Sequence, residues 1–214
     1  MRKSNTIIGA VAIGLAGGVG AIVKVFNDVR HKLKIKPRRG IVILGTQQSG
    51  KTTIYDFLQG KENAGASTNI DEYEEFEYHI DEKHSIKIRK GRDIGGGEEF
   101  IRTFYTKMMQ DSDIDICLFV FNSYKYVHEE EYRRDVNARL GLLHRKDMLA
   151  KKAAIIGSFV DQFPKTERAS VYQKIKALTR DKPYAELLTK QHFHLTDLTK
   201  KDKLKSLIDL TFKK

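Results

Sequence analysis

The eight residues GTQQSGKT, numbers 45–52, constrain the fold of this chain more than any other feature of its sequence. They complete the pattern G-x-x-x-x-G-K-[S/T], which holds a phosphate chain when a buried strand precedes it and a helix follows it. The apolar run 41–44 suits a buried parallel strand. Residues 53–58 have helical spacing and Gly60 is a stop signal, so a helix is predicted at 51–59. We therefore predict a strand, a phosphate-binding loop and a helix in succession.

The residue types in this loop match the chemistry of phosphate binding. Gly45 and Gly50 carry no Cβ, so the backbone can wrap closely around an anion. The N–H groups of the loop and of the following helix point at that anion. Lys51 brings a positive charge to the β- and γ-phosphates, and the Thr52 hydroxyl is a ligand for Mg²⁺. The residues predicted to contact the nucleotide here are Gly45, Thr46, Gln47, Gln48, Ser49, Gly50, Lys51, Thr52 and Thr53.

The remainder of the chain alternates between strand and helix patterns. Further strands are predicted near 73–80, 84–90, 115–121, 153–157 and 192–195, and further helices at 98–110, 126–145, 166–180 and 202–212. This alternation predicts an α/β fold with a mostly parallel sheet covered by helices on both faces. The acidic segment 73–80 alternates imperfectly and is predicted to be an edge strand. The single cysteine, Cys117, lies in the apolar run ICLFVF and is expected to be a buried thiol.

The N-terminal segment differs in composition from everything after it. Residues 7–23 form a run of 17 residues without a charge, within the range for a transmembrane helix. The dense basic block 24–39 follows, and the positive-inside rule then places the C-terminal side in the cytoplasm. A cleaved signal peptide and a buried core helix are weaker alternatives. We predict a single membrane anchor at 1–23, a juxtamembrane linker at 24–39 that contacts anionic headgroups, and a domain at 40–214.

The positive charge of the chain does not predict nucleic-acid binding. The formal net charge is +11, but residues 24–39 contain seven Lys or Arg against one Asp, and Arg2 and Lys3 precede the apolar run. Residues 71–82 contain seven acidic residues and no Lys or Arg. The basic block therefore belongs to the N-terminal segment, beside the predicted membrane surface, and no nucleic-acid partner is expected.

A second motif, RDIGGGEEF at 92–100, follows the predicted strand pair. Asp93 and Gly96 have D-x-x-G spacing, in which the Asp holds Mg²⁺ through a water and the Gly N–H meets the γ-phosphate. A phosphate loop, a strand pair and then D-x-x-G is the order of motifs in small GTPases. Residues 38–214 resemble the Ras superfamily and are most similar to its Arf-like branch, whose motif reads W-D-x-G-G-Q. With the anchor, the arrangement resembles the signal recognition particle receptor beta family, although the later motifs match that family poorly.

The resemblance implies a P-loop NTPase domain with a mostly parallel six-stranded sheet, binding GTP or GDP with Mg²⁺. It also implies a threonine that closes over the metal and the γ-phosphate. Thr68 is the candidate and Ser67 the alternative. The implied metal ligands are Thr52, Thr68 and Asp93, and the implied catalytic residues are Lys51, Gly96 and Glu98.

The guanine-recognition motif of the family, N/T-K-x-D, should follow the strand at 153–157. Ser158 stands in place of Asn or Thr, Phe159 in place of Lys, and Asp161 is retained. The resemblance implies that Asp161 accepts hydrogen bonds from guanine N1 and N2, while the Phe159 ring could stack on the base. The alternative is a loop carboxylate or helix cap at Asp161, and adenine or xanthine remain open as the base. The last base-contacting loop corresponds to Thr196, Asp197 and Leu198.

Hydrolysis is expected to be slow. Gly97 occupies the position where the Arf-like pattern has the glutamine that orients the attacking water. Glu98 and Glu99 either reach back toward the nucleotide or are first-turn helix acids, which the helix dipole favours. The sequence therefore predicts a membrane-anchored GTP-dependent switch that works with a protein effector or activator. A non-hydrolysing pseudo-GTPase receptor or scaffold is the alternative.

Overall fold

The computed structural model describes residues 38–61, 72–73, 76–79, 85–88, 91–92, 114–145 and 152–213. The chain divides into two compact units, 1–37 and 38–214, and every described residue belongs to the second. Within this described part, no helix has the length and apolar character needed to cross a bilayer. The predicted anchor at 1–23 lies outside the described residues, as does the linker up to residue 37. Residues 38 and 39, assigned to the linker from sequence, instead begin the first strand.

Four parallel strands form the continuous part of the sheet, with β1 and β7 on either side of β6 and β8 beyond β7. They are β1 (Arg38–Gly45), β6 (Ile114–Asn122), β7 (Lys152–Ser158) and β8 (Phe193–Leu195). All four end on the same edge because they run in one direction. The predicted α/β fold with a parallel sheet is therefore confirmed.

Two short strands extend the sheet beyond β1, in the order β3-β4-β1. β4 (Ser85–Ile88) is parallel to β1 and pairs at two positions, while β3 (Phe76–His79) is antiparallel to β4 and forms the edge. The edge position predicted for this acidic segment is confirmed. β3 and β4 lie within the predicted strands 73–80 and 84–90. Tyr73, predicted to begin the edge strand, instead belongs to β2 (Glu72–Tyr73), which pairs with β5 (Gly91–Arg92) in a separate antiparallel ladder.

The helix predicted at 98–110 lies outside the described residues. The other helices follow the predicted order, with different boundaries in places. α3 (Lys51–Gln59) and α8 (Lys201–Lys213) lie where they were expected. The single helix predicted at 126–145 is wrong, because Glu129 has an extended backbone that separates α5 (Ser123–His128) from α6 (Glu130–Arg145). The helix predicted at 166–180 is shorter, α7 (Val171–Thr179), and a 3-10 turn, η4 (Arg168–Ser170), precedes it. Two 3-10 turns were not predicted: η3 (Val160–Gln162) and η5 (Ala185–Leu188).

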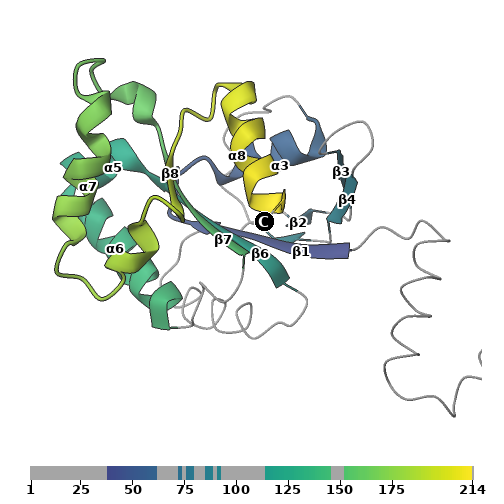
Figure 1. Cartoon of the computed structure of the whole chain (residues 1–214), viewed down its shortest axis with the longest axis horizontal. Helices are drawn as coiled ribbons and strands as arrows, with labels where there is room; N and C mark the ends of the chain where they lie inside the picture. The colour runs from purple at the N-terminus through teal and green to yellow at the C-terminus, as the bar shows by residue number, and fades with distance from the viewer. Residues whose placement is uncertain are drawn as a thin grey trace, which may run out of the picture. The chain divides into compact units, whose positions relative to one another are not determined.

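The sheet separates two apolar cores, as its alternating side chains require. Cys117, Phe119 and Phe121 of β6 pack with α5, α6, α7 and η5 on one face. Ile116 and Leu118 face the other side, against α3 and α8 (Figure 1). Cys117 is fully buried, as predicted from its apolar run. Helices on both faces are thereby confirmed, and the two cores fix the strand ends that carry the candidate site.

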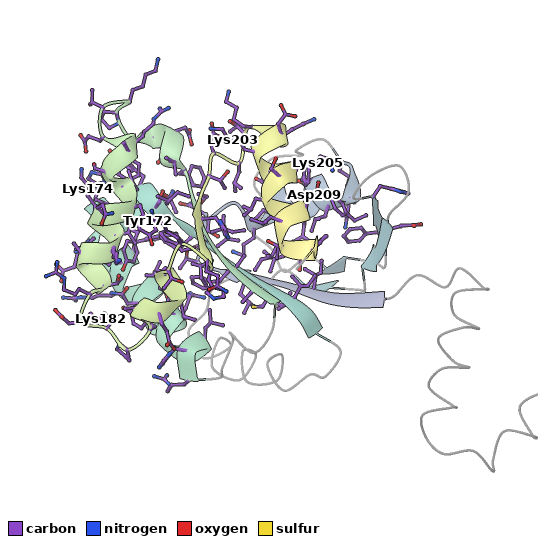
Figure 2. All side chains as sticks on the ribbon, in the orientation of Figure 1. Tyr172, Lys174, Lys182, Lys203, Lys205 and Asp209 are labelled. Carbon is purple, nitrogen blue, oxygen red and sulfur yellow. The ribbon has the colours of Figure 1, made fainter. Side chains whose placement is uncertain are left out.

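The edge strand β3 is attached to α8 by polar contacts beside the core that α3 and α8 cover. The Tyr78 hydroxyl donates to Asp209 Oδ1 at 3.0 Å, and Lys205 Nζ donates to Asp209 Oδ2 at 2.8 Å. Lys205 and Asp209 lie next to each other on α8 (Figure 2). Tyr78 also contacts the Phe212 ring edge-on, with centroids 5.4 Å apart. Phe57 of α3 contacts the same tyrosine ring, with centroids 6.2 Å apart, so both α3 and α8 hold the short edge strand.

Candidate nucleotide-binding site

The phosphate loop leaves the sheet at Gly45, where the backbone of β1 approaches β6 very closely. A Cβ on Gly45 would lie 2.0 Å from the carbonyl oxygen of Val120, and φ of Gly45 is 152°. The N–H of Thr46 donates to the same oxygen at 3.3 Å. Only glycine fits this position. The loop is thus fixed against the carboxyl end of β6, where ligands of parallel α/β sheets bind.

The other end of the loop forms the start of α3. Gly50 has φ 91° and is the N-cap residue, with no side chain to cap the first turn and no acidic residue within it. That helix terminus therefore presents a positive end toward the loop. Lys51 is 7% exposed, and its Nζ donates to the Thr46 carbonyl oxygen at 2.8 Å. The ammonium group is held within the loop itself, at the place where an anion would enter.

The predicted base-recognition residue Ser158 is bonded directly to the phosphate loop. Its Oγ lies 2.7 Å from the Ser49 carbonyl oxygen and 2.9 Å from that of Phe121. The Ser123 hydroxyl in turn donates to the carbonyl oxygen of Ser158. Ser49 Oγ is also buried here and has no hydrogen-bond partner among the described residues. The ends of β6 and β7 and the phosphate loop are therefore joined at one point.

The third predicted loop reaches the same point from β8. Thr196 is buried, and its N–H donates to the Gly157 carbonyl oxygen at 2.9 Å. Leu198 packs against the phosphate loop, since a Cβ on Gly50 would lie 2.5 Å from its Cδ1. Ser158 and Leu198 thus both lie against residues 49–50 of the phosphate loop, although up to about 150 residues of chain separate them from it.

Asp197 orders the third loop through contacts with its own neighbour. Its Oδ1 accepts hydrogen bonds from the Thr199 N–H at 3.0 Å and from the Thr199 hydroxyl at 2.6 Å. Burial alone would raise the pKa of Asp197, but these hydrogen bonds, with the charges of Lys200 and Lys203, hold it below its ordinary value. The carboxylate therefore acts as a turn-forming acceptor.

The loop between β7 and α7 presents a phenylalanine and an exposed carboxylate. Phe159 has a left-handed backbone, with φ 58°, and is half-buried. It is the N-cap residue of η3, so Asp161, inside the first turn, does not cap that turn. The Asp161 side chain is exposed, and no described residue donates a hydrogen bond to its carboxylate. The Arg168 guanidinium holds this turn by donating hydrogen bonds to the carbonyl oxygens of Asp161 at 2.6 Å and Phe163 at 3.0 Å.

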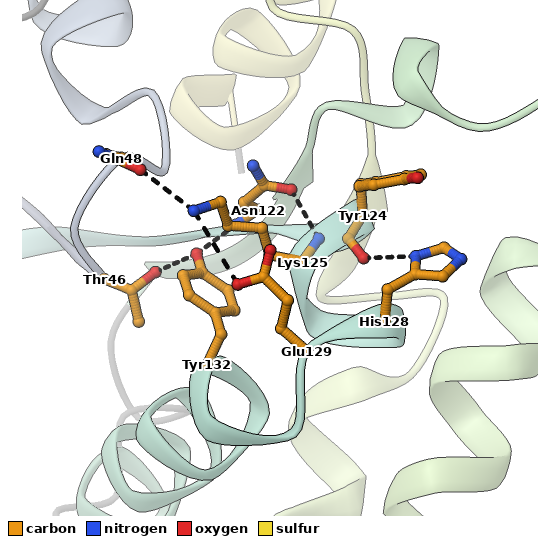
Figure 3. Close-up of polar contacts among 8 residues, drawn as sticks. All are labelled: Thr46, Gln48, Asn122, Tyr124, Lys125, His128, Glu129 and Tyr132. Atoms are coloured by element: carbon orange, nitrogen blue, oxygen red, sulfur yellow. Dashed lines mark hydrogen bonds and ion pairs between the residues drawn. The ribbon is translucent and has the colours of Figure 1, made fainter.

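A polar cluster that the sequence did not predict holds the side of the phosphate loop that faces α5 and α6, called its outer side below (Figure 3). Thr46 is buried, and its hydroxyl is hydrogen-bonded to that of Tyr132 on α6. The Asn122 N–H donates to the same tyrosine oxygen at 2.7 Å. Burial raises the pKa of Tyr132 to about 12. Lys125 Nζ donates to Gln48 Oε1 at 3.1 Å.

A buried arginine reaches the loop from further along α6. Arg139 pairs with Asp135 through hydrogen bonds of 2.9 and 3.1 Å, and its NH1 lies 3.4 Å from the Gly45 carbonyl oxygen. Arg139, Tyr132 and Lys125 belong to no recognisable motif. The only signal in the sequence was their position in the segment that follows a predicted strand ending at the site.

Some of the remaining predicted site residues lie in the described part of the chain and others do not. Gln47 is exposed, and Thr52 and Thr53 are half-buried in the first turn of α3. Thr52 is thus the only predicted metal ligand in the part of the chain that the structure describes. Thr68, Asp93, Gly96 and Glu98 lie outside the described residues, together with Gly97.

Comparisons with known proteins support the fold. No family model matches this sequence, and no curated protein matches it. A crystal structure of a glycine-to-proline variant of SsGBP matches with a TM-score of 0.54 at 13% identity, over 90% of this chain and 60% of that one. A bacterial selenocysteine-specific elongation factor, EF-Sec, matches with a TM-score of 0.52 at 11% identity, over 82% of this chain and 28% of that one.

These likenesses show the fold alone, because both identities are low. This chain spans 60% of the SsGBP chain and 28% of the EF-Sec chain that it matches. The complete phosphate-loop motif lies between β1 and α3, so the domain is an α/β domain that carries a P-loop. The Arf-like assignment stays a prediction.

Proposed function

We propose that this chain is a guanine-nucleotide-binding protein that acts as a switch. The observation that carries the proposal is the 2.7 Å hydrogen bond from Ser158 Oγ to the Ser49 carbonyl oxygen. It joins the loop suited to phosphates to the loop that carries Asp161. A single bound molecule could therefore contact both, with a phosphate chain at one end and a base at the other.

Each group in the described site has a role in such a complex. The α3 terminus and Lys51 bind the phosphates. The Ser49 hydroxyl has no partner among the described residues, which is consistent with loops completed by a ligand. The Thr52 hydroxyl is suited to ligate Mg²⁺, which when bound neutralises charge on the β- and γ-phosphates. Phe159 stacks on the base, and the Asp161 carboxylate accepts from two guanine N–H groups.

Nucleotide titration of the purified full chain in detergent, with Mg²⁺, tests this proposal. We expect GTP and GDP to bind more tightly than ATP or XTP. Lys51→Ala should weaken GTP binding about a hundredfold, because it removes a nearly buried, charge-assisted contact. Lys176→Met, which changes an exposed lysine on α7, is the matched control and should bind normally. A preference for ATP would contradict the role of Asp161.

The rate of turnover separates two forms of this function. Gly97 stands where the Arf-like pattern has a water-orienting glutamine, so we propose slow hydrolysis that an activating protein accelerates. The same residue favours a second candidate, a pseudo-GTPase receptor or scaffold that binds GTP without cleaving it. Turnover of several GTP per minute by the protein alone would contradict both forms. Slow turnover supports the switch, and binding without turnover supports the receptor.

We further propose that residues 1–23 anchor the domain to a membrane, facing the cytoplasm, where a protein effector or activator meets it. The support is the uncharged run 7–23 and the basic block that follows it. The basic block would then contact anionic headgroups.

A further inference from the structure

Lys125 lies in the first turn of α5, and its side chain contacts the phosphate loop. Its backbone N–H donates to the side chain of Asn122, which caps the helix, at 3.0 Å. Its Nζ donates to Gln48 Oε1 at 3.1 Å and lies 4.0 Å from Glu129 Oε2 (Figure 3). The ammonium is also 5.9 Å from the centroid of the Tyr132 ring. These contacts fix the ammonium at the outer side of the loop.

Gln48, the residue that Lys125 contacts, has an unfavourable backbone conformation. Gln48 has φ 54°, in the left-handed region that side chains with a Cβ rarely adopt. Such a conformation persists only where the surrounding structure holds it. Among the described residues, Lys125 is the side chain that holds the side chain of Gln48. Lys125 therefore contacts the residue with the left-handed backbone directly, at an exposed position of the loop.

The two hydrogen bonds that hold the outer side of the phosphate loop, Thr46–Tyr132 and Gln48–Lys125, differ in how accessible they are to water. Thr46 is fully buried and bonded to Tyr132, whose hydroxyl also receives the Asn122 N–H. The Lys125 side chain is 32% exposed and that of Glu129 is 52% exposed. Water can therefore replace the partners of Lys125 at small cost, whereas the Thr46 attachment stays closed.

We propose that Lys125 is a positioning residue that holds Gln48 in its left-handed conformation, and that it thereby sets how fast a bound guanine nucleotide leaves. When Lys125 releases Gln48, that residue relaxes toward a common backbone conformation. The loop N–H groups then turn away from the phosphates. This inference rests on the proposed function, because it concerns nucleotide held by the same loop.

Displacement of a fluorescent guanine nucleotide from the full chain tests this role. Lys125→Met should speed dissociation about fivefold, as expected for loss of a partly exposed charged hydrogen bond, with little change in association. Lys125→Arg, which keeps a cationic donor, should restore most of the wild-type rate. Lys176→Met is the matched control and should dissociate at the wild-type rate.

A second background distinguishes positioning from general loss of structure. Gln48→Gly removes the strained side chain, so glycine can hold the left-handed backbone without help. In that background Lys125→Met should change dissociation by less than about twofold, because the two effects act through one contact. Thermal unfolding of the nucleotide-free protein should be nearly the same for wild type and Lys125→Met.

Three outcomes would overturn the inference while the proposed function stands. They are unchanged dissociation in Lys125→Met, a fivefold effect that persists in Gln48→Gly, and a matching fall in nucleotide-free thermal stability. Failure of the wild-type chain to bind guanine nucleotide would overturn the proposed function and this inference together.

Discussion

At the scale of single residues, Ser158 connects two loops of the candidate site through one small side chain. The family pattern has Asn or Thr there, yet the serine hydroxyl, which is fully buried, still reaches the carbonyl oxygens of Ser49 and Phe121. A buried hydroxyl requires such partners, because an unsatisfied one is costly. With serine at this position, the loop that carries Asp161 is connected directly to the phosphate loop.

Asp161 provides a direct test of which base is bound. In Asp161→Asn, an amide N–H₂ would face the N–H groups of guanine, but it would match the 2-carbonyl of xanthine. We expect GTP affinity to fall roughly 10- to 100-fold and XTP affinity to rise, since unpaired polar groups give strong discrimination. Competitive titration of the two nucleotides measures this.

The control for this exchange is Asp181→Asn, another exposed aspartate, after α7, which should change neither affinity. Equal losses of GTP and XTP binding in Asp161→Asn would indicate damage to the loop, and would contradict guanine recognition by this carboxylate.

Asp197 should make stability depend on pH. The pKa of its carboxyl lies below its ordinary 3.8 in the folded chain, so the unfolded chain binds more protons as the pH falls through this region. The stabilisation is therefore fully present above about pH 4 and is lost as the pH drops toward the lowered pKa. Urea unfolding from about pH 2 to 6, with Asp197→Asn for comparison, measures it. A difference between the two proteins that stayed constant over this range would contradict the prediction.

At the scale of elements, the junction of β1 and β6 depends on Gly45. Gly45 pairs with Val120, and a Cβ would lie 2.0 Å from its carbonyl oxygen. Because that neighbour is backbone in the centre of the sheet, it cannot move aside. We expect Gly45→Ala to lower the free energy of unfolding by at least about 3 kcal/mol, measured by chemical denaturation.

Gly60, which ends α3, is the matched control for this substitution. It also has positive φ, 69°, but a Cβ there would meet nothing within 4 Å. Gly60→Ala should therefore cost only the backbone penalty, about 1 kcal/mol. Equal losses in the two variants would show that the contact with Val120 is unimportant.

Elements with a strong local pattern were predictable, and those that depend on single residues were not. α3 follows from the loop motif and Gly60, and its bounds agree with the prediction. The break between α5 and α6 at Glu129 has no Gly or Pro to indicate it. The 3-10 turns η3 and η5 are three and four residues long, too short for a helical period to appear.

At the scale of the whole molecule, the approach of Ser158 and Leu198 to the phosphate loop was predictable, and the contacts that support this loop from α5 and α6 were not. The order of motifs indicated that residues 158–161 and 196–198 would meet the phosphate loop at the strand ends. The attachments from Tyr132 and Lys125 span 86 and 77 residues. Such contacts follow from the packing of α5 and α6 on the sheet, which one sequence does not reveal.

Membrane association is the prediction for the complete chain. Because the uncharged run 7–23 and the basic block precede the domain, the full chain should float with lipid vesicles in a density gradient. A chain that begins at Arg38, where the second compact unit starts, should stay at the bottom. Vesicles with and without phosphatidylserine separate the contribution of the basic block. Flotation of both chains, or of neither, would contradict the anchor.

The two ends of the sheet also affect how molecules behave when they are concentrated. Edge strands offer unpaired backbone groups through which sheets of different molecules can join. Here β3 has four residues and β8 has three, and β3 carries the exposed side chains of Glu77 and His79. Within the described residues, the two edges of the sheet therefore offer little free backbone to other molecules, which disfavours sheet-to-sheet aggregation.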